Sequence, residues 1–362
     1  MEMNYRDTSM WKEINETPAI FGRLIGANAE TMKKLVAAIK AGKSNNFVAA
    51  ARGASDHALI FFKYALEVNS NYTCGLSAPS VITLYKGKIN YSNSIVIGCS
   101  RSGKAADVLE VIKKGNDQGA ITIAVTNDTE SPIAKEAKFH LFCAAGAENS
   151  VAATKTFNAQ LYLLLWLASE LADKTDYIFT LKNLKAEIES VIPRIDALTM
   201  EYAEKFKDMK GGFVLSRGLT YAIALEATLK LQETGYIHMK GYASSDFYHG
   251  PIALVSEETP VIIYCARNDG DEEMQTIVRT DQIKLIEKTL SLGAPVLLIT
   301  NDFILTNKFR KVNEAFLNFN VPEEFSMFAF AIFAQMFACK ISCAIGNDPD
   351  SPRVLKKTTI TK

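Results

Sequence analysis

The sequence has no excess of charge of either sign and no segment that resembles a signal peptide. Its 362 residues include 40 lysines plus arginines and 40 aspartates plus glutamates. This balance gives no reason to expect nucleic acid or an anionic membrane as a partner, so an anionic ligand would need a local site. The N-terminal stretch MEMNYRDTSMWKEINETP lacks the apolar core of a secretion signal. We therefore expect a cytoplasmic protein.

Closely spaced cysteines and a membrane span are also missing. No CxxC pair occurs, and most of the cysteines lie in apolar runs, which favours buried, reduced thiols and gives no reason to expect a metal or a cofactor. The longest apolar stretch, 325–346, carries Gln335 and Lys340 at its centre, so it predicts a buried helix and not a membrane span. The six cysteines are Cys74, Cys99, Cys143, Cys265, Cys339 and Cys343.

A pattern of strands and helices occurs twice along the chain. In each half, a short apolar segment that ends in Arg-Gly precedes a helical pattern, and two further apolar segments follow in the same order. Three markers repeated in order indicate a duplicated domain. The segments are Phe47–Gly53, Ser94–Ser100 and Gly119–Asp128 in the first half, and Phe213–Gly218, Pro260–Ala266 and Gly293–Asp302 in the second.

Strands that alternate with helices and are apolar on both sides predict parallel sheets covered by helices on both faces. We therefore expect an α/β fold of two tandem domains, each a flavodoxin-like or Rossmann-like sandwich, at residues 20–175 and 195–345, followed by a tail at 346–362. The charged segment Asp176–Asp208 is expected to join the two domains, with a break into two helices at Pro193. Ligands of such sheets bind beyond the carboxyl ends of the strands.

One loop at such a strand end has the composition of a phosphate site. Ser100–Lys104 follows a predicted strand and opens a predicted helix, whose N-terminus offers backbone N–H donors and the positive end of its dipole. The hydroxyls of Ser100 and Ser102 add donors, and Gly103 lets the backbone approach a ligand. No GxxxxGKS or GxxxxGKT pattern occurs, so a nucleoside triphosphate is not expected. The alternative is that one of the serines merely caps the helix.

The matching loop of the second half, Ala266–Glu273, has no serine and has four acidic residues, so we expect it to repel phosphate and we expect one phosphate site per chain. Two more polar loops, 52–57 and 146–155, contain small residues that would allow a ligand close to the backbone. For the second of these, a capped helix start is an equally simple interpretation.

Six motifs in this order, spread over nearly the whole chain, resemble the sugar isomerase (SIS) family: RGASDHA, SRSG, AENSVAATK, ALEATLKLQETGYIH, SSDFYHGP and DPDSPRVLKK. The likeness is to the isomerase half of glutamine–fructose-6-phosphate aminotransferase and, more closely, to stand-alone SIS-type glucosamine-6-phosphate deaminases. It implies two tandem SIS domains and a homodimeric enzyme, with active sites shared between subunits, that acts on a phosphorylated amino sugar. The synthase begins with a glutaminase domain whose nucleophile is an N-terminal cysteine. Here residue 2 is Glu2 and no such domain precedes, so no glutaminase activity is expected.

The resemblance also assigns roles to residues. Glu233 matches the glutamate that carries a proton between C1 and C2 of the sugar, and His249 matches the ring-opening histidine, which serves the neighbouring subunit. Lys357 matches the lysine that contacts the sugar carbonyl and can form a Schiff base. By themselves, Glu233 would be surface charge and Lys357 tail charge, whereas His249 stands before a Gly-Pro that ends helices. Substrate contacts are implied for Gly53, Ser55, Ser100, Arg101, Ser102, Val151, Ala153 and Lys230.

Four positions depart from the family pattern. Ala105 replaces a phosphate-contacting threonine, Arg101 stands where glutamine is common, Ala153 replaces a serine, and Asp246 replaces a glutamate. These changes leave the identity of the sugar open. The leading interpretation is an enzyme that interconverts glucosamine 6-phosphate with fructose 6-phosphate and ammonia. The alternatives are a fructosamine-6-phosphate deglycase and a non-catalytic sensor of sugar phosphates, although the presence of all three catalytic matches argues against the sensor.

Overall fold

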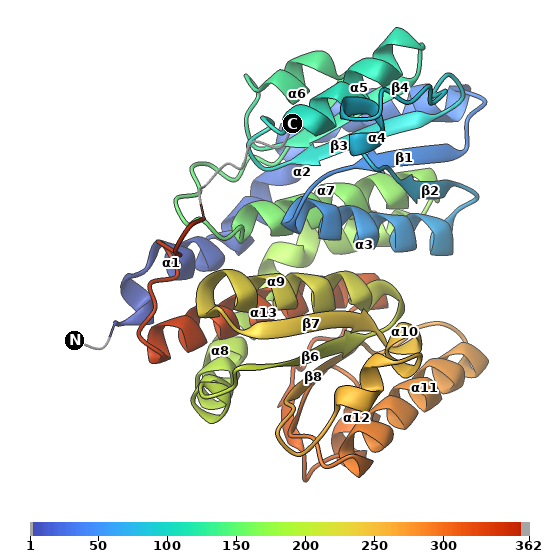
Figure 1. The fold of residues 1–362 in the computed structure, drawn as a ribbon. Coiled ribbons are helices and arrows are strands. Elements are labelled where there is room, and N and C mark those ends of the chain that lie inside the picture. The colour runs from blue at the N-terminus through green and yellow to red at the C-terminus, as the bar shows by residue number, and fades with distance from the viewer. Residues whose placement is uncertain (1–2, 356–362) are drawn as a thin grey trace. The chain divides into compact units, whose positions relative to one another are not determined.

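The computed structural model describes residues 3–355, which form two compact units (Figure 1). The N-terminal unit consists mainly of Asn15–Ala186, and the C-terminal unit contains Glu187–Arg353 together with the start of the chain up to Ile14. Each unit has one five-stranded parallel sheet flanked by helices. The expected duplication of an α/β fold is therefore confirmed.

The sheet of the N-terminal unit has the strand order β2-β1-β3-β4-β5, and every neighbouring pair is parallel. This is the flavodoxin-like order, in which the connections reverse direction between the first and third strands and leave a crevice for ligands there. The central strand β3 is buried along its whole length. The strands are β1 (Asn46–Ala50), β2 (Thr73–Leu76), β3 (Ile95–Ser100), β4 (Ile121–Thr126) and β5 (Phe139–Phe142).

The sheet of the C-terminal unit repeats this topology. Its order, β10-β9-β8-β6-β7, is the same when the sheet is followed from the other edge, and all its pairs are parallel. The connections between its strands therefore reverse direction between β6 and β8. The strands are β6 (Gly211–Ser216), β7 (His238–Ala243), β8 (Val261–Cys265), β9 (Val296–Thr300) and β10 (Asn313–Phe316).

Helices cover both faces of the first sheet. One layer contains α7 with α2 and α3 packed against it, and the other contains α4, α5 and α6. In α7 nearly every residue is buried, as expected for a helix enclosed by its neighbours. The helices are α2 (Thr17–Ala41), α3 (Ala54–Asn69), α4 (Ser80–Thr83), α5 (Ala106–Asp117), α6 (Pro132–Glu136) and α7 (Lys155–Leu171).

In the C-terminal unit, α9 and α13 pack together, while α11 packs on β8 and β9. The longer helices are α9 (Tyr221–Gly235), α11 (Glu272–Ser291), α13 (Glu323–Ala344) and α8 (Thr175–Phe206), of which the residues from Glu187 onward belong to this unit. The shorter ones are α1 (Ser9–Asn15), α10 (Ser244–Tyr248) and α12 (Phe303–Lys308), with single 3-10 turns η1 (Tyr5–Asp7), η2 (Gly218–Thr220) and η3 (Pro251–Leu254).

The long apolar stretch of the sequence is α13. Among the described residues it is the one helix long and apolar enough to cross a membrane, but 94% of its most apolar window is buried inside the structure. Its buried Lys340 Nζ donates to the Asp196 carboxylate at 2.5 Å and to the Thr199 hydroxyl at 2.9 Å. The predicted buried helix is therefore confirmed, and the six cysteines are likewise buried and form no disulfide.

The predicted break at Pro193 is wrong, because α8 continues through this residue. Pro193 is exposed, so water can replace the backbone hydrogen bond that its ring removes. Buried side chains at helical spacing on both sides of the proline, including Ile188, Val191 and Ile195, hold the two halves of the helix against the protein.

Candidate active site

The predicted phosphate loop has a tight, internally bonded backbone. The Gly103 N–H donates to the Ser100 hydroxyl at 3.2 Å, and the Lys104 N–H donates to the Ser102 hydroxyl at 3.3 Å. Gly103 has a φ of +63°, and a Cβ at this position would lie 2.0 Å from Oγ of Ser131. Only glycine fits both the conformation and the space.

No side chain of the loop caps the N-terminus of α5. Its N-cap residue is Ala105, which has no side chain able to accept a hydrogen bond, so the interpretation of Ser100 or Ser102 as a helix cap is wrong. Within the first turn, the buried Asp107 carboxylate accepts the N–H of Val108 at 2.9 Å and Nε of Arg52 at 2.7 Å. Arg52 follows β1, so the ends of β1 and β3 are tied together beside the loop. The arrangement leaves a positively polarised helix end where a phosphate could bind.

The loop that follows β1 contributes Gly53 and Ser55. Gly53 has a φ of +56° and begins α3, and a Cβ there would meet open space. Ser55 is buried, and its hydroxyl accepts a hydrogen bond from the side chain of Gln160 at 3.1 Å. The structure thus places both predicted contacts at the carboxyl end of β1, next to the strand that carries the phosphate loop.

Arg101 supports the third predicted loop, 146–155. Its Nη1 donates to the carbonyl of Val151 at 2.9 Å, to the carbonyl of Ser150 at 3.3 Å and to the Glu148 carboxylate at 3.4 Å. Its side chain is only 17% exposed. The arginine that stands where relatives commonly have glutamine therefore positions a neighbouring loop, and its contact with a substrate stays a prediction.

The same loop is anchored by Glu148, whose side chain is 2% exposed. Its carboxylate accepts from the N–H groups of Thr154 at 3.0 Å and of Thr156 at 3.1 Å, at the start of α7, and from both threonine hydroxyls. The interpretation of this segment as a capped helix start is thus confirmed. Val151 and Ala153 remain half-buried, in a position where a ligand could still meet them.

The predicted proton shuttle forms an ion pair on α9. Nζ of Lys230 lies 2.5 Å from a carboxylate oxygen of Glu233 and 3.4 Å from one of Glu226. Residues three and four apart on a helix share a face, which explains the contact. Lys230 and Glu226 are fully buried, whereas the Glu233 side chain is 22% exposed. A buried ammonium thus holds a carboxylate that solvent can still reach.

The C-terminal tail is fixed at the end of this helix. Tyr236 ends α9 in a left-handed conformation, with a φ of +56°. Its hydroxyl accepts from the Arg353 N–H at 2.8 Å, and the Arg353 guanidinium lies over its ring, 4.2 Å from the centroid. The attachment point is three residues from Glu233 along the chain. Lys357 lies outside the described residues.

His249 lies on an exposed turn directly after α10. Its N–H donates to the carbonyl of Asp246 at 3.1 Å, and the following Gly250-Pro251 opens a 3-10 turn. Asp246 is also exposed. The structure thus leaves the imidazole on the surface, on a different element from the pair on α9, and its assigned service to a neighbouring subunit stays a prediction.

The sequence also matches a known protein family, and the fold and loops described above agree with that match. Residues 42–181 and 205–342, more than half of the chain, match the SIS domain. The chain belongs to the SIS domain family. We refer to these two segments as the first and second SIS domains.

Three similar proteins illustrate the relationship. A glutamine–fructose-6-phosphate aminotransferase (isomerizing) of Aquifex aeolicus is 31% identical over 96% of this chain and 57% of its own length. The C-terminal domain of a glucosamine-fructose-6-phosphate aminotransferase from Francisella tularensis superposes with a TM-score of 0.81 at 26% identity, over 95% of this chain and 98% of that one. A glucosamine-6-phosphate deaminase from Thermotoga maritima, at 21% identity and a TM-score of 0.74 over 98% and 100% of the chains, shows the shared fold. The chain spans little more than half the length of the curated relatives that it matches.

The two SIS domains repeat more than their strands. Arg217 follows β6 and pairs with Asp281 of α11 at 2.5 Å, in the way that Arg52 pairs with Asp107 of α5. Similarly, Nη2 of Arg267 donates to the carbonyl of Val321 before α13, at 3.4 Å. These arginines stand at matching positions of the repeated strand ends, but their partners are distant in sequence and could not be identified without the structure.

In the second SIS domain, acidic residues of the loop that matches the phosphate loop accept backbone hydrogen bonds. Asp271 caps α11 by accepting the N–H of Met274 at 2.9 Å, and Asp269 accepts the N–H of Glu323 at the start of α13, also at 2.9 Å. Of these two donors, only the N–H of Met274 belongs to the helix that the loop opens, and Asp107 accepts the N–H of Val108 in the first copy in the same way. That the second copy does not bind phosphate stays a prediction from its four acidic residues.

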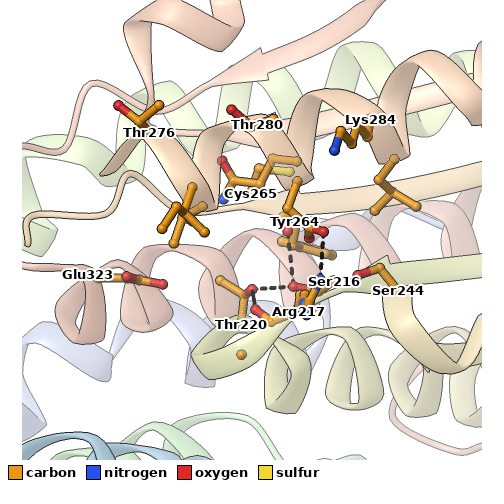
Figure 2. Close-up of a pocket in the computed structure, with 16 residues that line it drawn as sticks. Ser216, Arg217, Thr220, Ser244, Tyr264, Cys265, Thr276, Thr280, Lys284 and Glu323 are labelled. Carbon is orange, nitrogen blue, oxygen red and sulfur yellow. Dashed lines mark hydrogen bonds and ion pairs between the residues drawn. The ribbon is translucent and has the colours of Figure 1, made fainter. Parts of the chain in front are cut away.

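A cavity of about 640 Å³ nevertheless opens at the carboxyl ends of β6 and β8 (Figure 2). Sequence reasoning missed it, because its walls come from segments far apart in the chain. The walls include Ser216, Arg217, Thr220, Ser244, Cys265, Gln282, Leu285 and Glu323.

Proposed function

We propose that this chain interconverts glucosamine 6-phosphate with fructose 6-phosphate and ammonia, acting as an aldose–ketose isomerase and deaminase. The observation that carries the proposal is the pair formed by Lys230 and Glu233: a fully buried ammonium, 2.5 Å from a carboxylate that remains 22% exposed. Aldose–ketose chemistry needs one base that takes a proton from one carbon and returns it to the neighbouring carbon.

Glu233 is suited to this role by its position. The carboxylate must keep one orientation while it takes and returns the proton, and a charge-assisted hydrogen bond from Lys230 provides that orientation. Lys230 is itself held by burial on α9, so the pair is fixed before a substrate arrives. Such preorganised acid–base groups typically contribute about 10²–10⁴-fold to a rate.

The phosphate is proposed to bind the Ser100–Gly103 loop. The N-terminus of α5, whose N-cap residue Ala105 makes no side-chain cap, and the two serine hydroxyls support this assignment. Gly53, Ser55, Val151 and Ala153 are proposed to contact the rest of the sugar from the neighbouring loops. Arg101 contributes by holding the loop that carries Val151 and Ala153.

The remaining assignments complete the proposal. His249 would open the sugar ring in the active site of the neighbouring subunit, so the working unit would be a homodimer, and Lys357 would contact the sugar carbonyl. The Francisella and Aquifex relatives support an amino sugar phosphate as the substrate class, since both carry fructose-6-phosphate aminotransferase in their names. The proposed location of the enzyme is the cytoplasm.

The test is a coupled assay of the purified chain. Ammonia and fructose 6-phosphate should both appear from glucosamine 6-phosphate, in equal amounts, and added glutamine should not support the reverse reaction, whereas ammonia should. Fructosamine 6-phosphates carrying an amino acid serve as the second substrate, and the Glu233→Gln variant serves as the control for contaminating enzymes. Release of the amino acid without turnover of glucosamine 6-phosphate would replace the proposal with a deglycase.

A further inference from the structure

The cavity of the second SIS domain lies where this topology binds ligands. It opens between the carboxyl ends of β6 and β8, the pair of strands at which the connections reverse direction. Its volume, about 640 Å³, falls in the range of small-molecule sites. None of the residues assigned above to the sugar phosphate lines it.

The cavity contains a buried polar group that has no partner. Ser244 is 1% exposed, and its hydroxyl makes no hydrogen bond within the described part of the chain. Figure 2 shows this side chain pointing toward Ser216 across the cavity. Buried hydroxyls are almost always hydrogen-bonded in folded proteins, because leaving one unpaired is costly.

A second wall of the cavity also carries a buried polar atom without a hydrogen-bond partner. Nε2 of Gln282 on α11 donates to the carbonyl of Ala266 at 2.9 Å, which fixes the orientation of the amide. Its Oε1 is buried and makes no hydrogen bond in the described structure. An unpaired hydroxyl and an unpaired carbonyl oxygen therefore line one cavity. They are suited to a ligand that both donates and accepts hydrogen bonds.

The remaining walls match a sugar ring. Ser216 and Thr220 form a hydroxyl pair at the floor, and Ile277 and Leu285 supply aliphatic surface. A sugar presents hydroxyls at its edge and C–H groups on its faces, so it can use both kinds of surface. A phosphate is disfavoured here by the acidic residues of the adjacent loop, of which Asp271 already accepts the N–H of Met274 at the start of α11.

Glu323 gives the cavity an acidic side chain that is suited to an amine. Arg217 is neutralised by Asp281 at 2.5 Å, whereas the carboxyl of Glu323 faces the cavity with only the amide of Asn268 as its hydrogen-bond partner among the described contacts. In Figure 2, Lys284 lies at the opposite end of the cavity from Glu323, where it would not oppose a ligand cation. We propose that the second SIS domain binds an amino sugar that carries no phosphate, with its amine at Glu323 and its hydroxyls at Ser244 and Gln282.

The test is calorimetric titration at pH 7.5 with glucosamine, which lacks phosphate; this pH is chosen because burial raises the pKa of Glu323 to about 7 and its carboxyl must be ionised to pair with an ammonium. Wild-type protein should bind it, and glucose should bind at least tenfold more weakly because it has no ammonium group for Glu323. Ser244→Ala should weaken glucosamine binding about tenfold, whereas Ser245→Ala, an exposed neighbour, should leave it unchanged. Ser244→Ala should also raise the melting temperature of the unliganded protein, since it removes the unpaired hydroxyl.

The double variant Ser100→Ala/Ser102→Ala separates this site from the phosphate loop. The double variant should still bind glucosamine. This result does not depend on whether the chain turns over any sugar phosphate. The inference is overturned if wild-type protein does not bind glucosamine, if Ser244→Ala binds it as wild type does, or if the double variant loses binding.

Discussion

Replacement of Gly103 by alanine tests the construction of the phosphate loop. Gly103 has a φ of +63°, and the added Cβ would lie 2.0 Å from Oγ and 2.4 Å from Cβ of Ser131. The left-handed conformation costs alanine about 1–2 kcal/mol, and forcing an extra methyl group into a packed site costs about 1–3 kcal/mol more. Gly103→Ala should therefore lower the free energy of unfolding by about 2–5 kcal/mol.

Gly53 provides a control for a strained backbone without a steric contact. It also has a positive φ, +56°, but its ψ of −135° lies outside the left-handed helical region, and a Cβ there would meet nothing within 4 Å. Gly53→Ala should therefore show a backbone cost alone, about 1–3 kcal/mol. The contact with Ser131 is measured by adding Ser131→Gly to Gly103→Ala, which should recover most of the steric cost.

Urea denaturation of the four proteins gives the free energies, and the KM for glucosamine 6-phosphate reports the loop directly. Gly103→Ala should raise KM, because the backbone N–H groups around it would move away from the phosphate. If adding Ser131→Gly does not restore stability to Gly103→Ala, the steric reasoning about the loop is wrong.

Three further changes have defined outcomes. Lys230→Met leaves the buried Glu226 carboxylate without its ammonium and should cost about 3–5 kcal/mol in urea denaturation at pH 8, with recovery toward acidic pH; a pH-independent loss would contradict this. Burial raises the pKa of Glu323 to about 7 from 4.5, so the folded state holds a proton that the unfolded chain releases. Stability should then fall by up to about 3 kcal/mol as pH rises from 4.5 to 7, and Glu323→Gln should remove that slope; an unchanged slope would refute the assignment. Arg101→Ala should cost about 1.5–3 kcal/mol and speed amide hydrogen exchange in residues 146–154, and unchanged exchange there would exclude its supporting role.

The duplicated fold could be predicted because its central strands carry an unambiguous signal. β3 and β8 are buried along their whole length, so they appear in the sequence as continuous apolar runs. The edge strands β2 and β7 were missed, since most residues of β2 are exposed and β7 carries the exposed His238 and Lys240. Their pairing depends on the neighbouring strand more than on their own residues.

Part of the candidate site could also be predicted from the sequence. The phosphate loop follows from the composition after a parallel strand, and the positions of Lys230 and Glu233 on one helix face follow from their spacing. The complete burial of Lys230 could not be predicted, because it depends on the surrounding tertiary structure. Arg101 supports residues 146–154 through hydrogen bonds to groups about 50 positions away in the sequence, and no local sequence pattern indicates these bonds.

The most direct test of the proposed chemistry is the exchange of the substrate C2 hydrogen with solvent, followed by proton NMR in heavy water. Wild-type protein should exchange this hydrogen of glucosamine 6-phosphate. Glu233→Gln preserves the size of the side chain and should leave folding and KM nearly unchanged, while the exchange rate falls by about 10²–10⁴-fold. Exchange at the wild-type rate would show that Glu233 is not the base, and Asp246 would be the next carboxylate to test.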